Sequence, residues 1–212
     1  MRLYEFPPTR SIRVRWTLQE LGVPFELKLI DLDAGDQKKP EFLKLNPSGM
    51  VPAMIVDGEP QAEIAALLML LAERHPEANL APAPNTSGRA TYLRWMVYLA
   101  NTLQPAFRMW FYSDGDGGPE YSAFLKTMAR ERVEAVWDRV EATLADGRPY
   151  LLGDHISAAD FLLTMLTRWS RNMPKPATQW PKLGAYIARM KARPSLQEVH
   201  RREGLTEWIE AA

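Results

Sequence analysis

At the start of the chain, two short apolar runs typical of β-strands flank a segment whose apolar residues recur at helical spacing. Residues 3–6 and 25–30 are short apolar-rich runs bounded by proline or glycine, which predicts two strands. Between them, residues 11–21 carry apolar side chains at helical spacing, and Gly22 is expected to end the helix. A strand, a helix and a strand in this order predict a βαβ unit with parallel strands.

The next segment predicts a hairpin followed by a buried helix. The pair Asp57-Gly58 is a strong hairpin signal, and the helical stretch after it is rich in Ala, Leu and Met on most faces. The expected elements are a helix at 39–45, a turn at 46–49, a strand at 51–56, a return strand ending near 62 and a helix at 63–74. This order of elements is that of a thioredoxin-like domain.

The rest of the chain predicts helices. Residues 76–87 are rich in Pro, Ala and Asn, as in a linker. Five helices are expected after it, at 89–109 with a bend at Pro105, 120–144, 157–171, 183–192 and 195–203. The fold class is therefore α/β plus all-α. We expect a thioredoxin-like N-terminal domain over 1–77, a linker over 78–88 and an all-helical domain over 89–212.

A capping box marks the start of the helix at 157–171. Ser157 stands three residues before Asp160, so each side chain can bind a backbone amide at the helix start. We interpret this pair as structural and not as catalytic.

Composition narrows the function classes. The 212 residues hold 26 basic and 26 acidic side chains, and this zero net charge argues against electrostatic capture of nucleic acid. The chain has no cysteine, which excludes a protein thiolate nucleophile, a CxxC redox pair and a Cys-ligated zinc. Its three histidines lie far apart and match no metal-ligand spacing, so we expect no metal.

The sequence also indicates where in the cell the protein is located. The first residues lack the apolar stretch of a signal peptide, and the longest apolar run, 64–72, is too short to span a bilayer. We therefore expect a cytoplasmic protein without a membrane partner.

Four segments together resemble the cytosolic glutathione S-transferase family of the bacterial type. Residues 10–26 resemble its first helix and second strand, and residues 63–76 resemble its third helix. Residues 46–58 read NPSGMVPAMIVDG, close to the family pattern NPxGxVPxLxxDG, and the capping box matches one in its central C-terminal helix. The resemblance implies a transferase that uses glutathione as co-substrate, acts in detoxification and pairs into a homodimer.

The resemblance also implies a set of glutathione-binding residues. A cis peptide at Pro52 would direct the backbone of Val51 toward the cysteinyl part of glutathione. Glu63 would accept from its ammonium group, and the Ile64 amide at the helix start would meet its γ-glutamyl carboxylate. The set implied is Arg10, Gln37, Lys38, Met50, Val51, Pro52, Glu63 and Ile64, with Lys39 beside Lys38.

A Ser/Thr-like catalytic group is expected at the start of the first helix. A hydroxyl there can hydrogen-bond the glutathione sulfur and favour the thiolate. The candidates are Thr9 and Ser11, with Thr9 first because related sequences place a serine at its position. Both residue types also cap helices, so a structural role stays open for each.

Aromatic residues of the helical domain would line a site for a small hydrophobic electrophile between the domains. The candidates are Tyr98, Phe107, Trp110 and Tyr112. A glycine-rich loop at 112–118 could cover this site.

Two positions depart from the family pattern. Ile64 stands where the family has serine, and the missing hydroxyl removes a hydrogen bond to a charged group, worth about 1.5–3 kcal/mol. Met50 stands where many members carry Gln or Lys. Two alternatives to conjugation therefore remain: another glutathione-dependent reaction, such as dehalogenation, ether cleavage or reduction, and a non-catalytic ligand-binding protein with the same fold.

Overall fold

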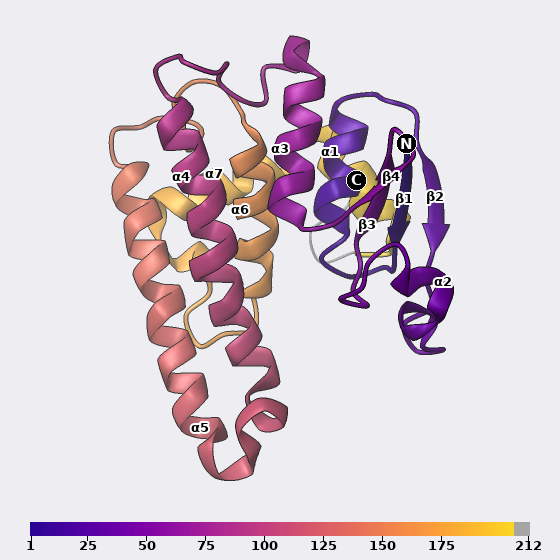
Figure 1. Cartoon of the computed structure of the whole chain (residues 1–212). Helices are drawn as coiled ribbons and strands as arrows, with labels where there is room; N and C mark the ends of the chain where they lie inside the picture. The colour runs from indigo at the N-terminus through magenta and orange to yellow at the C-terminus, as the bar shows by residue number, and fades with distance from the viewer. Residues whose placement is uncertain (206–212) are drawn as a thin grey trace. The chain divides into compact units, whose positions relative to one another are not determined.

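The chain forms two compact units, drawn in Figure 1. The computed structural model describes residues 1–205, with every side chain in that range except that of Asp116. One unit comprises Met1–Ala78 and the described residues from Lys191 onward, and the other comprises Asn79–Met190. The last helix of the chain thus belongs with the N-terminal unit, whereas the sequence suggested a single helical domain over 89–212.

The first unit has a thioredoxin-like order of elements. They are β1 (Arg2–Glu5), α1 (Ile12–Glu20), β2 (Glu26–Leu29), α2 (Pro40–Leu43), β3 (Ala53–Val56), β4 (Glu59–Gln61), α3 (Ile64–Arg74) and α8 (Pro194–Arg202). The sheet order is β2-β1-β3-β4, with β1 and β2 parallel and the other neighbours antiparallel. The predicted βαβ unit, hairpin and thioredoxin-like fold are confirmed.

The hairpin between β3 and β4 follows from its two turn residues. Asp57 and Gly58 have φ angles of 54° and 85°, and Val56 pairs with Glu59 across the turn. Two consecutive positive φ angles define the tight turn whose twist matches that of the flanking strands.

Side chains that alternate along β1 give the sheet two buried faces. Leu3 and Met54 are paired across β1 and β3 on one face, and both are fully buried. Tyr4 lies on the other face, where its ring meets Phe42 of α2 edge to face at 6.2 Å. In Figure 1, α1 and α3 lie on one side of the sheet and α2 on the other.

Helix α1 is more deeply buried than its sequence suggests. Every residue from Ile12 to Leu18 is buried, including Arg13 and Arg15. The reason is that α8 packs on α1, where Trp16 Nε1 donates to Ser195 Oγ at 2.9 Å. Helix α1 is therefore covered by a segment that lies 179 residues away in sequence.

The second unit is helical, as predicted. It contains α4 (Arg89–Tyr98), a π-helical segment (Leu99–Leu103), α5 (Gln104–Thr143), α6 (Ala158–Trp169), a 3₁₀ turn (Ala177–Gln179) and α7 (Pro181–Lys191). The 3₁₀ turns at Asp36–Lys38 and Pro76–Ala78 belong to the first unit. The π-helical segment ends at Leu103, two residues before Pro105, which has no N–H to give to the preceding turn.

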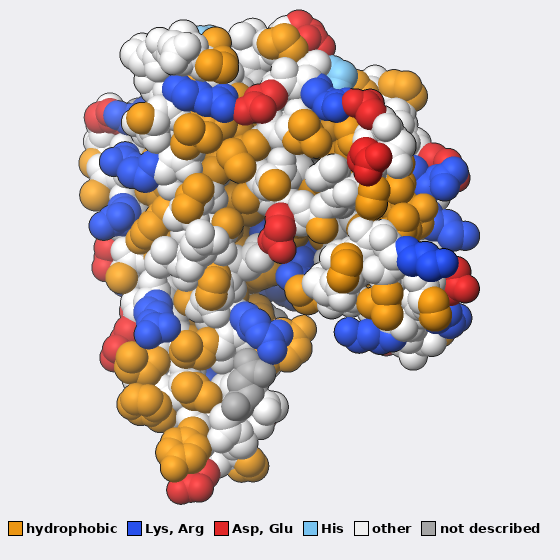
Figure 2. All heavy atoms as spheres, viewed as in Figure 1, with side chains coloured by type: hydrophobic (Ala, Val, Ile, Leu, Met, Phe, Trp, Pro, Cys, Tyr) orange, Lys and Arg blue, Asp and Glu red, His pale blue; other side chains and the backbone are white. Residues whose placement is uncertain are grey.

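The expected loop at 112–118 is largely helical. Backbone angles leave the helical region only at Tyr112 and Gly118 within α5, and the chain reverses there in Figure 1. Four large aromatic side chains around this reversal are exposed, namely Phe111, Tyr112, Tyr121 and Phe124. Figure 2 shows hydrophobic side chains at the surface of this end of the helical unit. The glycine-rich composition therefore serves a helix reversal and not a long loop.

Two negative findings apply to residues 1–205. No group of three or more His, Asp or Glu side chains in that range could hold a metal ion. No helix described there has both the length and the apolar character needed to cross a membrane.

The predicted capping box is present and extends into a larger network. The carboxylate of Asp160 accepts from the Ser157 amide and hydroxyl, both at 2.8 Å. It also accepts from the Leu151 amide and the Tyr186 hydroxyl, both at 3.0 Å. Burial raises the pKa of this carboxyl, and the hydrogen bonds from its four donors oppose that shift.

This network predicts that Asp160→Asn destabilises the helical unit. An amide keeps the shape of the side chain but turns an acceptor into a donor that faces buried donors, at a cost of about 3 kcal/mol. Denaturant unfolding followed by circular dichroism measures the loss. The matched control is Asp154→Asn, at an exposed position in the loop that leads into α6. Equal stability of the two variants would contradict this role of Asp160.

Candidate functional site

The loop before α1 lies against the loop before β3. The guanidinium Nη2 of Arg10 lies 3.4 Å from the thioether sulfur of Met50, whose side chain is 42% exposed. Two positions that the sequence singled out separately therefore lie together at one edge of the first unit.

Lys38 approaches the same loop from the segment before α2. Gly49 has a φ of 62°, and a Cβ added there would lie 2.9 Å from Lys38 Nζ and 3.0 Å from the carbonyl oxygen of Gln37. Only glycine fits both this backbone angle and this close approach. The ammonium group of Lys38 thus lies beside the turn, whereas that of Lys39 pairs with Asp36 at 2.6 Å.

Asn46 holds the turn in shape. Its side-chain amide donates to the carbonyl of Met50 at 2.7 Å, and its side-chain oxygen accepts from the amide of Ser48 at 3.2 Å. Asn46 is buried, so these bonds are shielded from water. They fix the backbone just before Val51.

Val51 presents its backbone at this edge. The Val51–Pro52 peptide bond is cis, as the resemblance implied. Within residues 1–205, neither the amide nor the carbonyl of Val51 has a hydrogen-bond partner. An extended peptide could therefore pair with this residue as an added strand does.

Glu63 has an unusual backbone at the start of α3. Its φ is 66° and its ψ is 107°, a combination that costs a non-glycine residue roughly 1–3 kcal/mol. The register Met54↔Gln61, continued by two residues, places Glu63 beside Pro52. The strained residue thus lies at the same edge as the Met50 loop.

No side chain in residues 1–205 caps the N-terminus of α3 by a hydrogen bond. Glu63 occupies the N-cap position without a side-chain capping bond, and the first turn holds no acid. The leading amides, including that of Ile64, therefore remain available to an anion. The side chain of Ile64 itself is buried in the unit.

The two candidate hydroxyls lie together but differ in exposure. Thr9 Oγ1 lies 2.9 Å from Ser11 Oγ and accepts from the Ser11 amide at 3.3 Å. Ser11 is 1% exposed, whereas Thr9 is half-buried. Of the two, the hydroxyl of Thr9 is therefore the one that a ligand can approach.

The start of α1 is electropositive. Arg13 is fully buried, and its Nε donates to the carbonyl of Arg10 at 3.2 Å. Burial, and then the charge of Arg10, lower the pKa of Arg13 to about 9. With Lys38 nearby across the turn, this edge of the unit favours an anionic ligand.

The aromatic candidates of the helical unit do not form one cluster. Phe107 is fully buried and packs on Trp137 and Trp169, so it is a core residue that a substrate cannot reach. Tyr98 lines a cavity, and it precedes Tyr112 by 14 helical positions, about 21 Å along a helix axis. Trp110 is half-buried and Tyr112 is 57% exposed near the helix reversal.

The loop at Thr9–Arg10 and the segment Met50–Pro52 form one edge of the first unit, which we call the binding edge. The sequence analysis overlooked two residues that shape this edge. The role of Asn46 could have been predicted, because an Asn before Pro-Ser-Gly is an Asx-turn signal. The unusual backbone of Glu63 has no such local signal, since it depends on how β4 leads into α3.

Comparison with known proteins identifies the family. Residues 9–74 match the family model of the glutathione S-transferase N-terminal domain, and residues 100–203 match that of the C-terminal domain. Glutathione S-transferase GST-4.5 of Xanthomonas campestris is 31% identical over 97% of this chain and its own full length. Glutathione S-transferase GstA of Escherichia coli O157:H7 is 28% identical, with 97% of this chain and 100% of that protein covered.

Solved structures agree with this assignment. A sphingomonad glutathione S-transferase complexed with glutathione has 31% identity and a TM-score of 0.84, with 97% of this chain and 100% of that chain covered. A glutathione S-transferase from Xylella fastidiosa has 28% identity and a TM-score of 0.86, with 96% and 98% covered. The chain belongs to the glutathione S-transferase family and is a glutathione transferase.

The hydrogen bonds of Asn46 predict that Asn46→Ala loosens the binding edge. The variant leaves the Met50 carbonyl without its buried donor, which costs about 1–3 kcal/mol of stability. Denaturant unfolding measures this loss, and titration with glutathione should show weaker binding. In Ser48→Ala, the control, the bond to Met50 is kept and stability should change by less than about 0.5 kcal/mol. An Asn46→Ala variant as stable as this control would refute the role.

Proposed function

We propose that this enzyme binds glutathione at the Met50–Pro52 edge of its first unit and activates the glutathione thiol through Thr9. The observation that carries the proposal is the meeting of the Thr9–Arg10 loop with the Met50 loop, seen in the contact between Arg10 and Met50. The sphingomonad relative, which has the same fold, was solved in complex with glutathione.

The unpaired backbone of Val51 is assigned to the cysteinyl part of glutathione. Two antiparallel hydrogen bonds, one to its amide and one to its carbonyl, would hold the tripeptide in an extended form. This pairing fixes the direction of the ligand, so its γ-glutamyl and glycyl ends must lie at opposite sides of Val51 and Pro52.

The γ-glutamyl end is assigned to the start of α3. Its carboxylate accepts from the Ile64 amide and is stabilised by the positive end of the helix. Its ammonium group is paired with Glu63, which is exposed and held in the strained conformation described above. Strain of this kind persists where the position of a functional group matters more than local stability.

The glycyl carboxylate is assigned to Lys38. Its ammonium group already lies beside Gly49, one residue before Met50. Gln37 supports this position, since its side-chain amide donates to the carbonyl of Leu32 at 3.3 Å. Met50 contributes apolar contact where other members carry a polar side chain.

The thiol is activated by a short chain of hydroxyl groups. The two hydroxyl oxygens lie 2.9 Å apart and either can donate. We assign the donor role in this pair to Ser11, which leaves the hydrogen of Thr9 for the glutathione sulfur. A hydrogen bond to the thiolate lowers the pKa of the thiol, and the positive charge of Arg10 acts in the same direction. Ser11 is thus a positioning residue, and Thr9 is the catalytic one.

The thiolate then attacks a hydrophobic electrophile. The carbon–sulfur bond forms as the leaving group departs with its electron pair, or as the electron pair moves into a conjugated acceptor. Among the aromatic candidates from the sequence, Trp110 and Tyr112 are accessible near the helix reversal and are assigned to such a substrate. Phe107 only supports this region from the core.

We further propose that the enzyme is a homodimer of the cytoplasm that acts in detoxification. A chain without cysteine needs no oxidising compartment, which supports the location.

The strain at Glu63 gives a test in which stability and binding move in opposite directions. In Glu63→Gly, the positive φ becomes unstrained, so the free energy of unfolding should rise by about 1 kcal/mol. The ammonium of glutathione loses its partner, so the dissociation constant should rise about tenfold or more. Denaturant unfolding and calorimetric titration with reduced glutathione measure the two effects.

A matched control is Asn85→Gly, which also replaces an exposed residue with positive φ. It should leave glutathione binding unchanged. Unchanged binding in Glu63→Gly would remove Glu63 from the site. Absence of glutathione binding by the wild-type enzyme would refute the site as a whole.

A further inference from the structure

Met50 is the most exposed methionine of the chain. The residue is 42% exposed, and Met1 follows at 38%. The other eight of the ten methionines are buried or half-buried, and all ten lie within residues 1–205. Because the chain has no cysteine, methionine provides all of its sulfur. The thioether of Met50 is therefore the sulfur that a dissolved oxidant meets most readily.

The sulfur of Met50 lies beside a guanidinium group. Arg10 Nη2 is 3.4 Å from Met50 Sδ, and no carboxylate among residues 1–205 pairs with Arg10. A thioether is only a weak acceptor, so this contact compensates the charge of Arg10 poorly. Two more cations are close to the same edge: Arg13, whose pKa the charge of Arg10 lowers, and Lys38, which lies beside Gly49.

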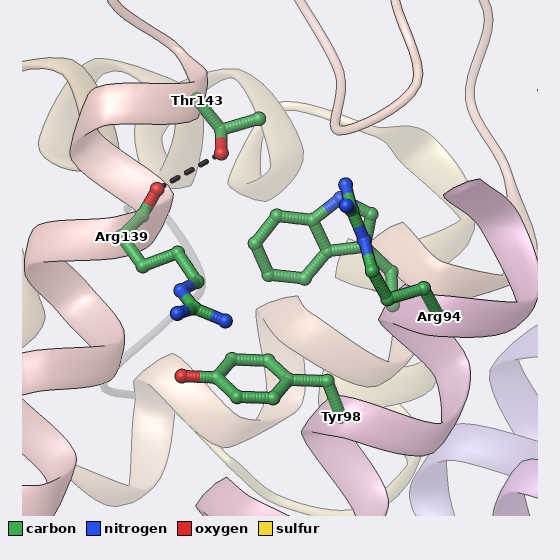
Figure 3. Close-up of a pocket in the computed structure, with 5 residues that line it drawn as sticks. Arg94, Tyr98, Arg139 and Thr143 are labelled. Carbon is green, nitrogen blue, oxygen red and sulfur yellow. Dashed lines mark hydrogen bonds between the residues drawn. The ribbon is translucent and has the colours of Figure 1, made fainter.

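Two arginines of the helical unit lie against aromatic rings instead of sulfur. In the cavity drawn in Figure 3, the guanidinium of Arg139 extends toward the Tyr98 ring and lies 4.8 Å from its centre. Arg108 lies over the Tyr112 ring in the same way, at 4.9 Å. An aromatic face attracts a guanidinium through its quadrupole and presents no sulfur lone pair. The contact of Arg10 with Met50 thus has a chemistry that these two contacts lack.

Oxidation of Met50 would turn this weak contact into a strong one. The sulfur lone pair attacks one oxygen of a hydroperoxide, and the O–O bond breaks as the S–O bond forms. The departing oxygen takes up a proton and leaves as water or an alcohol, so sulfur loses two electrons and the peroxide gains them. Arg10 is placed to stabilise the negative charge that develops on the departing oxygen. The sulfoxide oxygen is then a good acceptor for the same guanidinium.

The new bond would change the binding edge through the side chain of Met50 alone. The backbone carbonyl of Met50 is already held by the side-chain amide of Asn46 at 2.7 Å. A sulfoxide puts a polar group where the thioether gives glutathione apolar contact, directly beside Val51. It also holds the guanidinium of Arg10, whose charge otherwise favours the glutathione thiolate. Both effects work against the bound tripeptide.

We propose that Met50 is an oxidation site, at which a hydroperoxide forms methionine sulfoxide with Arg10 as the positioning residue, and that the sulfoxide weakens glutathione binding. The effect on binding rests on the proposed function, whereas the oxidation itself does not. Methionine sulfoxide reductases return the sulfoxide to the thioether, so the change is reversible. Oxidation of one side chain therefore regulates the binding edge.

Peptide mapping by mass spectrometry tests the oxidation site. The enzyme is treated with hydrogen peroxide in the absence of glutathione, and sulfoxide formation is followed at each methionine. Met50 should oxidise faster than each of the others, Met1 included. In Arg10→Gln, the rate at Met50 should fall about threefold or more, because no cation stabilises the departing oxygen, and the rate at Met1 should not change. Equal rates at Met50 and Met1 in the wild type, or an unchanged Met50 rate in Arg10→Gln, would overturn the assignment.

Calorimetric titration with reduced glutathione tests the regulation. Once the peroxide has been removed, the oxidised enzyme should have a dissociation constant at least about threefold higher than that of the untreated enzyme. Methionine sulfoxide reductases A and B together should restore the original value. In Met50→Leu, which has a side chain of similar volume without sulfur, peroxide treatment should leave the dissociation constant of the variant unchanged.

The matched control is Met128→Leu, at a half-buried methionine of α5 in the other unit. It should bind glutathione and respond to peroxide as the wild type does. Loss of affinity after peroxide in Met50→Leu, or full affinity in a wild type oxidised at Met50, would refute the regulation. Absence of binding by the untreated enzyme would refute the proposed function and the effect on binding with it. Peptide mapping needs no glutathione, so it decides the oxidation site in either case.

Discussion

The ion pair between Arg15 and Glu5 is the interaction on which the position of the site depends. Glu5 ends β1 and Arg15 lies in α1, and both are buried with their charged atoms 2.7 Å apart. Burial raises the pKa of the Glu5 carboxyl, and the charge of Arg15 opposes this shift. Because an unpaired buried charge is costly, the pair fixes both ends of the loop that carries Thr9 and Arg10. Glu203, directly after α8, completes the enclosure, with its carboxylate 3.8 Å from Arg15.

The binding edge combines rigid support with local strain. Asn46 and Gly49 hold the turn before Met50, so the backbone of Val51 is presented in one conformation. Glu63 is held in an unfavourable conformation at the start of a helix that no described side chain caps. The unit thus gives up some local stability in order to place a carboxylate next to free helix amides, which suits a zwitterionic peptide end such as the γ-glutamyl group.

The sequence was most informative where structure depends on neighbouring residues. The Asp57-Gly58 turn and the capping box at Ser157 are set by residues at most four positions apart, and both are present. The sequence was least informative about contacts between segments that lie far apart in the chain. No local pattern reveals that α8 covers α1, so the burial of Arg13 and Arg15 does not follow from the helical pattern. Phe107 failed as a substrate residue for a similar reason, since an aromatic side chain has the same signature in a core and in a pocket.

The central claim is that the hydroxyl of Thr9 stabilises the thiolate of bound glutathione. The most direct measurement is a pH titration of the ultraviolet absorbance of the thiolate in the complex, for the wild type, Thr9→Val and Ser11→Ala. In the wild type, the pKa of the bound thiol should lie well below the value of about 8.5 for a free thiol. It should return toward that value in Thr9→Val and shift less in Ser11→Ala. A bound thiol that titrates identically in the wild type and in Thr9→Val would contradict the account.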